Sequence, residues 1–229
     1  MKKLLICGIN GRTGSCVCEL ANSYGFSVAC GVDKNAAKNQ NPPFLFRVYD
    51  KLEDVTERVD AVIDFSSPEL ADLALDFCKK NNAALVCGTT ALKPDFYKKA
   101  KAAAKSVLIC VDVNFSASLH AVLRAANLLN QSLTGYDKAL IETHGAQKKD
   151  APGGTALLLS QKLAIKQVFS VRGGSAAGEH AITFLGEGEQ VEIIHRASDK
   201  SVFAKGALLC LSRLLKEKVG FFTADDLLK

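Results

Sequence analysis

The sequence lacks the cysteine spacing of a metal or disulfide framework, although eight of its 229 residues are cysteine. It has no CxxC pair and no ladder of cysteines and histidines, which structural zinc sites need. Cys7, Cys87 and Cys110 stand inside apolar runs, where cysteine behaves as a small hydrophobic residue. We therefore expect no metal, free thiols and a reducing, cytoplasmic location.

Long apolar segments and clustered positive charge are also missing. No stretch approaches the ~20 apolar residues of a membrane span. The apolar run after the two N-terminal lysines stops at Gly8, too early for a signal peptide. A net charge of +5 without lysine or arginine runs suits a protein that handles acidic metabolites. We expect no targeting segment, no membrane partner and no nucleic-acid partner.

The first half of the chain alternates short apolar runs with helical patterns. Continuous apolar strands between helices predict a parallel sheet covered on both faces. The expected strands are 4–8, 26–33, 59–66, 83–90 and 106–116, and the expected helices are 13–24, 68–81 and 93–105. A polar stretch without periodicity, residues 34–43, is expected to be a surface loop.

Near residue 115 the pattern changes, which predicts a second domain. The expected helices are 116–133, 150–164 and 201–218, and the expected strands are 137–144, 167–174, 179–186 and 190–198. The last three strands alternate apolar and polar residues, as in an open sheet with one face solvated or covered by a partner. We place the domains at 1–114, completed by a C-terminal helix at about 204–229, and at 115–203.

Residues 8–14, GINGRTG, stand where the first expected strand meets the first expected helix. Asn10 replaces the middle glycine of the commoner motif and tolerates the left-handed backbone of such a turn. A pyrophosphate can rest on the free N–H groups at the helix N-terminus. Alone, such glycines also occur where a strand and a helix simply pack tightly.

Asp33 supports the dinucleotide interpretation, because an acid at the end of the second strand accepts hydrogen bonds from an adenosine ribose. Lys34 and Arg12 offer partners for a 2′-phosphate, so the predicted cofactor is NADH, NADPH or both. Residues 87–90, CGTT, and 113–116, VNFS, follow strand ends, where ligands of open α/β sheets bind. The glycine of CGTT would admit a nicotinamide ring, whereas the alternative is a pair of ordinary turns.

Residues 141–159, IETHGAQKKDAPGGTALLL, contain the second candidate site. Thr155 is expected to cap a helix, and its N–H group and those of the preceding glycines would form an anion site. His144 can exchange a proton at neutral pH, and Lys148 supplies positive charge or, if desolvated, an acid. Such a set suits acid catalysis on an anion, and the alternative is a charged surface turn.

Motifs that run nearly from end to end of the chain are GINGRTG, DFSSPE, GTT, NFS, ETHGAQKKDAPGGTAL, GEHAITF and EIIHRASDKSVFAKGAL. They resemble the 4-hydroxy-tetrahydrodipicolinate reductases (dihydrodipicolinate reductases) of lysine and diaminopimelate biosynthesis. The block from Glu-x-His to Gly-Thr-Ala is diagnostic of that family. The resemblance implies an α/β fold with a Rossmann-type doubly wound parallel sheet. It also implies an α+β domain with a mixed open sheet for substrate binding and for assembly, usually into a homotetramer.

The implied reaction is the NAD(P)H-dependent reduction of 4-hydroxy-tetrahydrodipicolinate, a small cyclic dicarboxylate, to tetrahydrodipicolinate. By this resemblance His144 is the proton donor or acceptor, and Lys148 is a second proton donor and carboxylate partner. The implied substrate-binding residues are Gly145, Gly153, Gly154 and Thr155. The implied cofactor-binding residues are Gly8, Ile9, Asn10, Gly11, Arg12, Thr13, Asp33, Lys34, Gly88, Thr89, Thr90, Asp112, Val113, Asn114 and Phe115.

Several positions depart from the family pattern. Gly145 stands where the family usually has a second histidine, and Gly153 stands where serine is common. Lys149, usually apolar in the family, offers replacement charge, and the segment between residues 163 and 178 is shorter than expected. These changes leave the reaction class intact and bear on substrate affinity.

The other histidines have less specific interpretations. His120 is expected to be a packing or surface residue of the long helix, and structural hydrogen bonding is at least as expected as chemistry for His180 and His195. Two other functions fit the sequence. One is a different Rossmann oxidoreductase acting on amino acids or sugars, and the other is a cofactor-sensing protein that has lost its chemistry.

Overall fold

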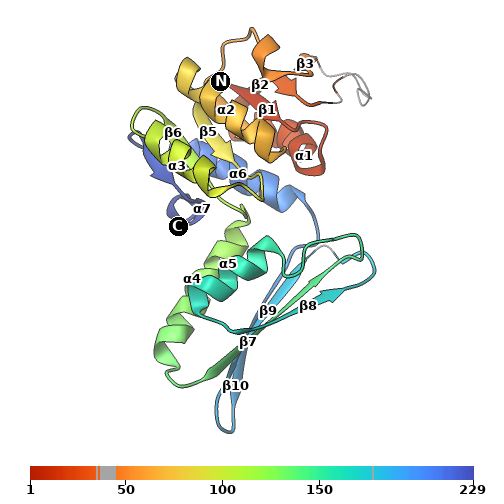
Figure 1. Cartoon of the computed structure of the whole chain (residues 1–229), viewed down its shortest axis with the longest axis vertical. Coiled ribbons are helices and arrows are strands. Elements are labelled where there is room, and N and C mark those ends of the chain that lie inside the picture. Colours follow the sequence, from red (N-terminus) through yellow and green to blue (C-terminus); the bar gives the residue numbers. More distant parts are fainter. Residues whose placement is uncertain (35, 37–44, 177) are drawn as a thin grey trace. The chain divides into compact units, whose positions relative to one another are not determined.

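The computed structural model describes residues 1–34, 36, 45–176 and 178–229. It forms two compact units, Met1–Phe115 with Ser201–Lys229, and Ser116–Lys200 (Figure 1). The predicted surface loop, 34–43, lies outside the described residues except for Lys34 and Ala36. In the described part of the chain, no helix has the length and apolar character to cross a membrane.

The first unit is built on a seven-stranded sheet in the order β11-β6-β5-β4-β1-β2-β3, with every neighbouring pair parallel. Its strands are β1 (Lys2–Cys7), β2 (Phe26–Val32), β3 (Arg47–Tyr49), β4 (Ala61–Asp64), β5 (Ala84–Cys87), β6 (Leu108–Val111) and β11 (Gly220–Phe222). From β3 to β6 this is the doubly wound order of dinucleotide-binding domains, so the predicted fold class is confirmed. The edge strands β3 and β11 were not predicted, because three residues are too few to show a pattern.

Helices cover both faces of this sheet. They are α1 (Arg12–Leu20), α2 (Pro68–Asn81), α3 (Pro94–Ala103), α6 (Ser201–Leu214) and α7 (Ala224–Leu227). Val17 of α1 and Leu208 of α6 belong to the core of one face, and Leu75 of α2 and Phe96 of α3 belong to the core of the other. Burying apolar side chains on both faces explains why the strands are continuously apolar.

Two helices end four residues before their predicted ends. The first helix ends at Leu20, and the chain continues as a 3-10 turn, Ala21–Tyr24, that stops at Gly25 with a φ of +82°. The last long helix ends at Leu214 rather than 218, so the C-terminal residues are not one helix. They form β11 and α7 instead, and Thr223 and Asp226 make a capping box at the start of α7.

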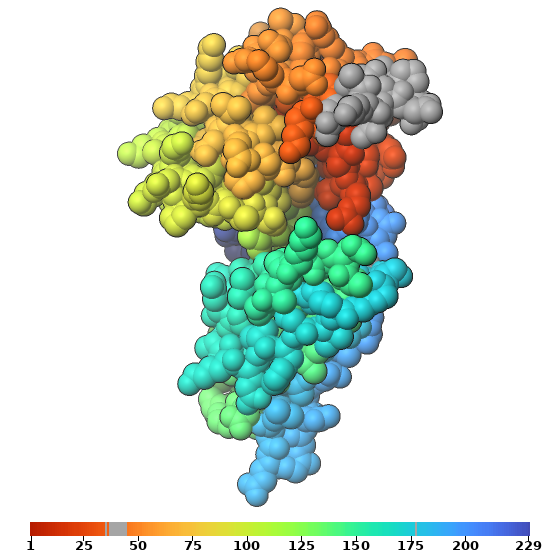
Figure 2. Space-filling model, turned by 45° about the vertical axis from the view of Figure 1, so that its right-hand side comes forward, coloured from red at the N-terminus to blue at the C-terminus, as the bar shows by residue number. Residues whose placement is uncertain are grey.

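The second unit is a four-stranded mixed sheet with two helices on one face (Figure 1). Its elements are α4 (Ala117–Ser132), β7 (Asp137–His144), α5 (Gly154–Leu163), β8 (Gln167–Arg172), β9 (Glu179–Leu185) and β10 (Gln190–Arg196). The order is β10-β9-β7-β8, with β7 and β8 parallel and the other pairs antiparallel. The hairpin of β9 and β10 projects from this unit in both whole-molecule views (Figures 1 and 2).

One face of this second sheet is packed and the other is open. Leu140 and Phe184 are fully buried with side chains of α4 and α5. Ile141, Phe169 and Val171 point to the opposite face and are 43%, 54% and 47% exposed. The mixed, one-sided sheet was predicted, and its open apolar face leaves room for a partner.

Candidate active site

The loop between β1 and α1 is shaped by glycines at close backbone approaches. Gly8 has a φ of +75°, and a Cβ there would lie 2.3 Å from the carbonyl oxygen of Phe65. A Cβ at Gly14 would lie 2.1 Å from the carbonyl oxygen of Gly8. Gly11 precedes α1 without a side-chain cap, so the first N–H groups of the helix have no intrahelical or capping partner. This end of α1 has the geometry of an anion site.

Asp33 follows β2, and its Oδ2 accepts a hydrogen bond from the N–H of Asn10 at 3.1 Å. The predicted ribose acceptor and the predicted phosphate loop therefore lie together. Lys34 and Arg12 are exposed, whereas the side chain of Ile9 is fully buried. Ile9 can contact a ligand only through its backbone.

The hydroxyl group of Thr89, at the end of β5, forms hydrogen bonds with other residues of the protein. Its Oγ1 donates to Asp64 Oδ2 at 2.7 Å and accepts from the N–H of Ser66 at 2.8 Å. Burial raises the pKa of Asp64, although hydrogen bonds from Ser66, Thr89 and Cys87 oppose the rise. Of the two predicted threonines, Thr90 is the exposed one. Asp64 was not singled out from the sequence.

The remaining predicted cofactor residues also lie in the first unit. A Cβ at Gly88 would lie 2.1 Å from the ring of Phe65, so packing alone requires this glycine. The Phe65 ring also meets the ring of Phe115 edge-on, with 5.8 Å between centroids. Asp112 Oδ2 accepts from the N–H of Ala224 at 3.0 Å, which ties it to the start of α7. The other two residues of this segment are Val113, which is half-buried, and Asn114, which is buried.

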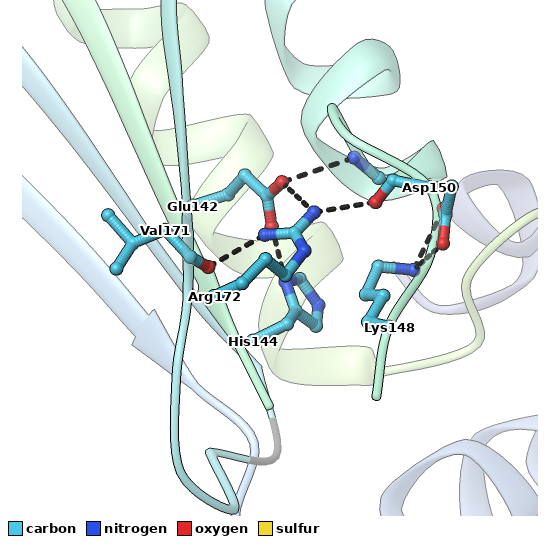
Figure 3. A network of polar contacts seen from close by, with 7 residues as sticks. Glu142, His144, Lys148, Asp150, Val171 and Arg172 are labelled. Carbon is cyan, nitrogen blue, oxygen red and sulfur yellow. Dashed lines mark hydrogen bonds and ion pairs between the residues drawn. The ribbon is translucent and has the colours of Figure 1, made fainter. Parts of the chain in front are cut away.

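In the second unit, Glu142 and His144 point to the same face of β7 because they stand two residues apart (Figure 3). His144 Nδ1 is hydrogen-bonded to Glu142 Oε2. Glu142 Oε1 accepts from Arg172 Nη2 at 2.5 Å and from the N–H of Gly153 at 3.3 Å. The Glu142 side chain is completely buried and has charged or polar partners on both oxygens.

These contacts set the charge states of the site. Burial by itself raises the pKa of Glu142, but hydrogen bonds from Arg172, Ser170 and His144 outweigh it and hold that pKa at about 2. Burial lowers the pKa of His144, and the charges of Lys148 and Arg172 lower it further, while Glu142 opposes them. At neutral pH the site therefore contains an ionised Glu142 beside a neutral imidazole.

Lys148 belongs to the same network through Asp150 (Figure 3). Lys148 Nζ donates to Asp150 Oδ1 at 2.7 Å and Oδ2 at 2.8 Å, and this bond lowers the pKa of Asp150. Arg172 Nη2 donates to the carbonyl oxygen of Asp150 at 2.6 Å. Sequence reasoning missed Glu142 and Arg172, although the two-residue spacing of Glu142 from His144 on a strand was a usable signal.

Helix α5 begins at Gly154, and its N-cap is Gly153 rather than the predicted Thr155. Thr155 is the second helical residue, because Gly153 already has an extended backbone with φ −70° and ψ 159°. The N–H of Gly153 is bonded to Glu142, and the next N–H groups, those of Gly154 and Thr155, belong to the first turn of α5, where the helix dipole favours an anion. A Cβ at Gly153 would lie 2.8 Å from Lys148 Cε, which places the lysine side chain over this glycine.

Gly145 packs against the connection between β8 and β9. Its N–H donates to the carbonyl oxygen of Ala176 at 2.8 Å, and a Cβ there would lie 3.2 Å from that oxygen. The next N–H, of Ala146, donates to the carbonyl oxygen of Gly174 at 3.1 Å. The backbone of Gly174 and Ala176 therefore lies against Gly145, which stands where the family that the sequence resembles usually has a second histidine.

Two further histidines lie behind His144 on neighbouring strands. The rings of His144 and His180 are 5.3 Å apart, and those of His180 and His195 are 6.5 Å apart. Burial and the two neighbouring histidines lower the pKa of His180 to about 4, and its ring nitrogens have no hydrogen-bond partner among the described residues. His195 Nε2 lies 3.3 Å from Ser116 Oγ and 3.1 Å from Ser118 Oγ.

Metal-ligand spacing occurs once among the described residues. Glu142, His144 and His180 offer three ligand atoms within 4.8 Å of one another, but both Glu142 oxygens already bond protein groups.

His120, expected to be a packing or surface residue, is buried in α4. All eight cysteines are free.

Comparisons with known proteins match the whole chain. The family model described as "Dihydrodipicolinate reductase, N-terminus" matches residues 2–115, and the model described as "Dihydrodipicolinate reductase, C-terminus" matches residues 116–228. A 4-hydroxy-tetrahydrodipicolinate reductase of Caldanaerobacter subterraneus subsp. tengcongensis is 33% identical, with 100% of this chain and 99% of the relative covered. One from Stenotrophomonas maltophilia strain R551-3 is 34% identical, with 99% and 98% covered.

A solved structure has the same fold. The dipicolinate-bound dihydrodipicolinate reductase from Paenisporosarcina sp. TG-14 superimposes with a TM-score of 0.81. The two chains are 21% identical, and 97% of each is covered.

Proposed function

The chain belongs to the dihydrodipicolinate reductase family, and on that basis we propose that it reduces 4-hydroxy-tetrahydrodipicolinate to tetrahydrodipicolinate with a nicotinamide dinucleotide. The observation that carries the proposal is the network joining His144, Lys148 and the start of α5. It supplies a proton carrier, a cation and the N-terminal end of a helix in one place. A cyclic dicarboxylate that must gain a proton needs these three features.

The second unit is the proposed substrate site. The N–H groups of Gly154 and Thr155 and the ammonium group of Lys148 hold a carboxylate. His144, bonded to Glu142 through Nδ1, exchanges its proton at Nε2. Gly145 and Gly153 have no side chain and contribute backbone only. The proton that joins the ring comes from Lys148, or from His144 after its Nε2 has taken up a proton.

The first unit is the proposed cofactor site, and a bound dinucleotide supplies the hydride. Gly8 and Gly14 leave no room for a Cβ, and the uncapped start of α1 offers N–H groups to a pyrophosphate, so these residues fit the cofactor. Asp33 accepts from a ribose hydroxyl, and Lys34 pairs with a 2′-phosphate where NADPH is used. The other proposed contacts are Ile9, Asn10, Gly11, Arg12, Thr13, Gly88, Thr89, Thr90, Asp112, Val113, Asn114 and Phe115.

A homotetramer formed through the second sheet completes the proposal. Ile141 and Phe169 are register partners on the open face, and Val171 lies beside them. Exposed aliphatic and aromatic side chains that adjoin on a sheet favour burial against another copy of the chain. Eight free cysteines support a reducing compartment, and we place the enzyme in the cytoplasm.

To test the proposed activity, purified protein is mixed with freshly generated 4-hydroxy-tetrahydrodipicolinate and either NADH or NADPH. We expect the near-ultraviolet absorbance of the reduced nicotinamide to fall only when this substrate is present. Turnover of an amino acid or a sugar instead would favour another Rossmann oxidoreductase. Tight dinucleotide binding without any turnover would favour a cofactor-sensing protein.

A further inference from the structure

We propose that Glu142 and Arg172 are positioning residues for His144: Glu142 fixes the imidazole with Nδ1–H turned inward, and Arg172 holds Glu142 and the Lys148 segment in place. The significance of this arrangement for turnover rests on the proposed function. The arrangement itself is a property of the free protein and can be measured without substrate.

The tautomer follows from the hydrogen bonds of Glu142. Its Oε1 accepts from two N–H groups, those of Arg172 and Gly153, as an ionised carboxylate does. An ionised carboxylate has no hydrogen to donate, so the contact between Oε2 and His144 Nδ1 requires the hydrogen on Nδ1. His144 Nε2 is then the nitrogen that gains and loses a proton. A Cβ at Gly178 would lie 3.2 Å from this nitrogen, so the glycine keeps it clear of a side chain.

Arg172 connects three segments of the second unit (Figure 3). It is the register partner of His144 across the parallel pair β7 and β8. Its Nη2 donates hydrogen bonds to Glu142 Oε1 on β7 and to the carbonyl oxygen of Asp150 before α5. Its Nη1 donates a hydrogen bond to the carbonyl oxygen of Val171 at 2.7 Å. A lysine has a single ammonium centre and cannot reproduce this fork.

Charged and titratable groups face His144 from every neighbouring element. They are Glu142 on its own strand, Arg172 on β8, His180 on β9, with His195 on β10 behind it, and Lys148 with its partner Asp150 before α5. Glu142 raises the pKa of His144, whereas Arg172 lowers it. Removing Glu142 should therefore lower the pKa of His144, and removing Arg172 should raise it. A general loosening of the fold would not give opposite signs.

The experiment is a nitrogen-15 NMR titration of the histidines in the full chain without substrate. The variants are Glu142→Gln, Arg172→Met and Arg172→Lys. Exposed groups of the same unit provide the matched controls Glu189→Gln and Lys166→Met. We expect neutral His144 to carry its proton on Nδ1 in the unchanged protein and in both controls.

Glu142→Gln should give a mixture of tautomers and a lower pKa of His144. Arg172→Met should raise that pKa, and Arg172→Lys, which keeps the charge, should restore it towards the original value. In the reductase assay Glu142→Gln should lower kcat at least about 10-fold, but by no more than the 10²- to 10⁴-fold that a proton-transfer group contributes. Dinucleotide binding should stay unchanged.

An unaltered His144 tautomer and titration in Glu142→Gln would overturn the proposal. So would shifts of the same sign in Glu142→Gln and Arg172→Met. Should Glu142→Gln fail to fold, the comparison of Arg172→Met with Arg172→Lys carries the test, and equal titrations of His144 in those two variants would refute it. Because the spectra need no substrate, a failure of the proposed reaction leaves this result readable.

Discussion

Arg172 Nη2 lies 2.5 Å from Glu142 Oε1 in a partly buried ion pair between residues 30 positions apart in the chain. The same guanidinium group holds the backbone of Asp150, whose carboxylate binds Lys148. One arginine thus joins the strand that carries His144 to the segment that carries Lys148. The two proposed proton-transfer groups are parts of a single hydrogen-bonded unit.

His144→Gln should lower kcat by about 10²- to 10⁴-fold, the usual contribution of general acid–base catalysis. Glutamine keeps a side chain of similar size but cannot carry a proton at neutral pH. Steady-state kinetics measures the loss, and calorimetry with the dinucleotide is the control, because the cofactor loop belongs to the other unit. A variant with undiminished turnover would rule out this role for His144.

Lys148→Ala should lower kcat/KM by about 10- to 100-fold, since a charged hydrogen bond contributes about 1.5–3 kcal/mol. The matched control is Lys166→Ala, which removes an exposed lysine of the same unit and should leave the kinetics unchanged. Separate values of kcat and KM for 4-hydroxy-tetrahydrodipicolinate in both variants distinguish loss of the carboxylate partner from loss of a proton. Equal kinetics in the two variants would contradict the assignment.

Gly8→Ala should abolish dinucleotide binding and lower the thermal unfolding midpoint. The added Cβ would lie 2.3 Å from a carbonyl oxygen in a residue with a φ of +75°. Gly25→Ala is the control, because Gly25 has a φ of +82° but open space around its Cα. It should cost only the left-handed strain of about 1–2 kcal/mol and leave binding intact. Dinucleotide binding by folded Gly8→Ala would remove the loop from the cofactor site.

Glu142 should make stability depend on acidity. Its pKa is about 2 in the folded protein and 4.5 ordinarily, so it stabilises the fold above pH 4.5, and this stabilisation is lost as the pH falls through 2. At about 1.4 kcal/mol per pH unit, the contribution at neutral pH reaches up to about 3 kcal/mol. Urea unfolding of wild type and Glu142→Gln should show a difference that shrinks between pH 4.5 and 2. A difference that stays constant would contradict the assigned ionisation.

Phe169→Lys should dissociate the proposed homotetramer, because it places a charge on the open face of the second sheet. Leu128→Lys is the control, since Leu128 is 65% exposed on α4, away from that sheet face. Light scattering after size-exclusion chromatography measures the mass of each. A tetramer that survives Phe169→Lys unchanged, or a wild-type monomer, would refute the proposed interface.

The proximity of the glycine loop and Asp33 was predictable because the signals for both are local. Glycine spacing between the first strand and helix, and Asp33 after the second strand, each fit within a short window, and the structure brings Asn10 and Asp33 together. His144 and Lys148 also stand within one short window, and the structure joins them in one hydrogen-bonded network. The cap of α5 was predicted at Thr155 instead of Gly153, because two successive glycines leave the start of a helix undefined in sequence.

Arg172 could not be found in this way. It reaches Glu142 because β8 runs parallel to β7, and apolar alternation does not specify which strands pair or in what direction. The histidines of β9 and β10 lie near His144 for the same reason, through cross-strand register. Only the three-dimensional structure combines these separate strands into one site.

The measurement that tests the central claim most directly is product analysis with both dinucleotides. Wild-type protein is incubated with freshly generated 4-hydroxy-tetrahydrodipicolinate and NADH or NADPH, and the product is identified by mass spectrometry. The account predicts tetrahydrodipicolinate in step with dinucleotide oxidation for at least one cofactor. Folded protein that binds a dinucleotide but forms no tetrahydrodipicolinate with either one would contradict it.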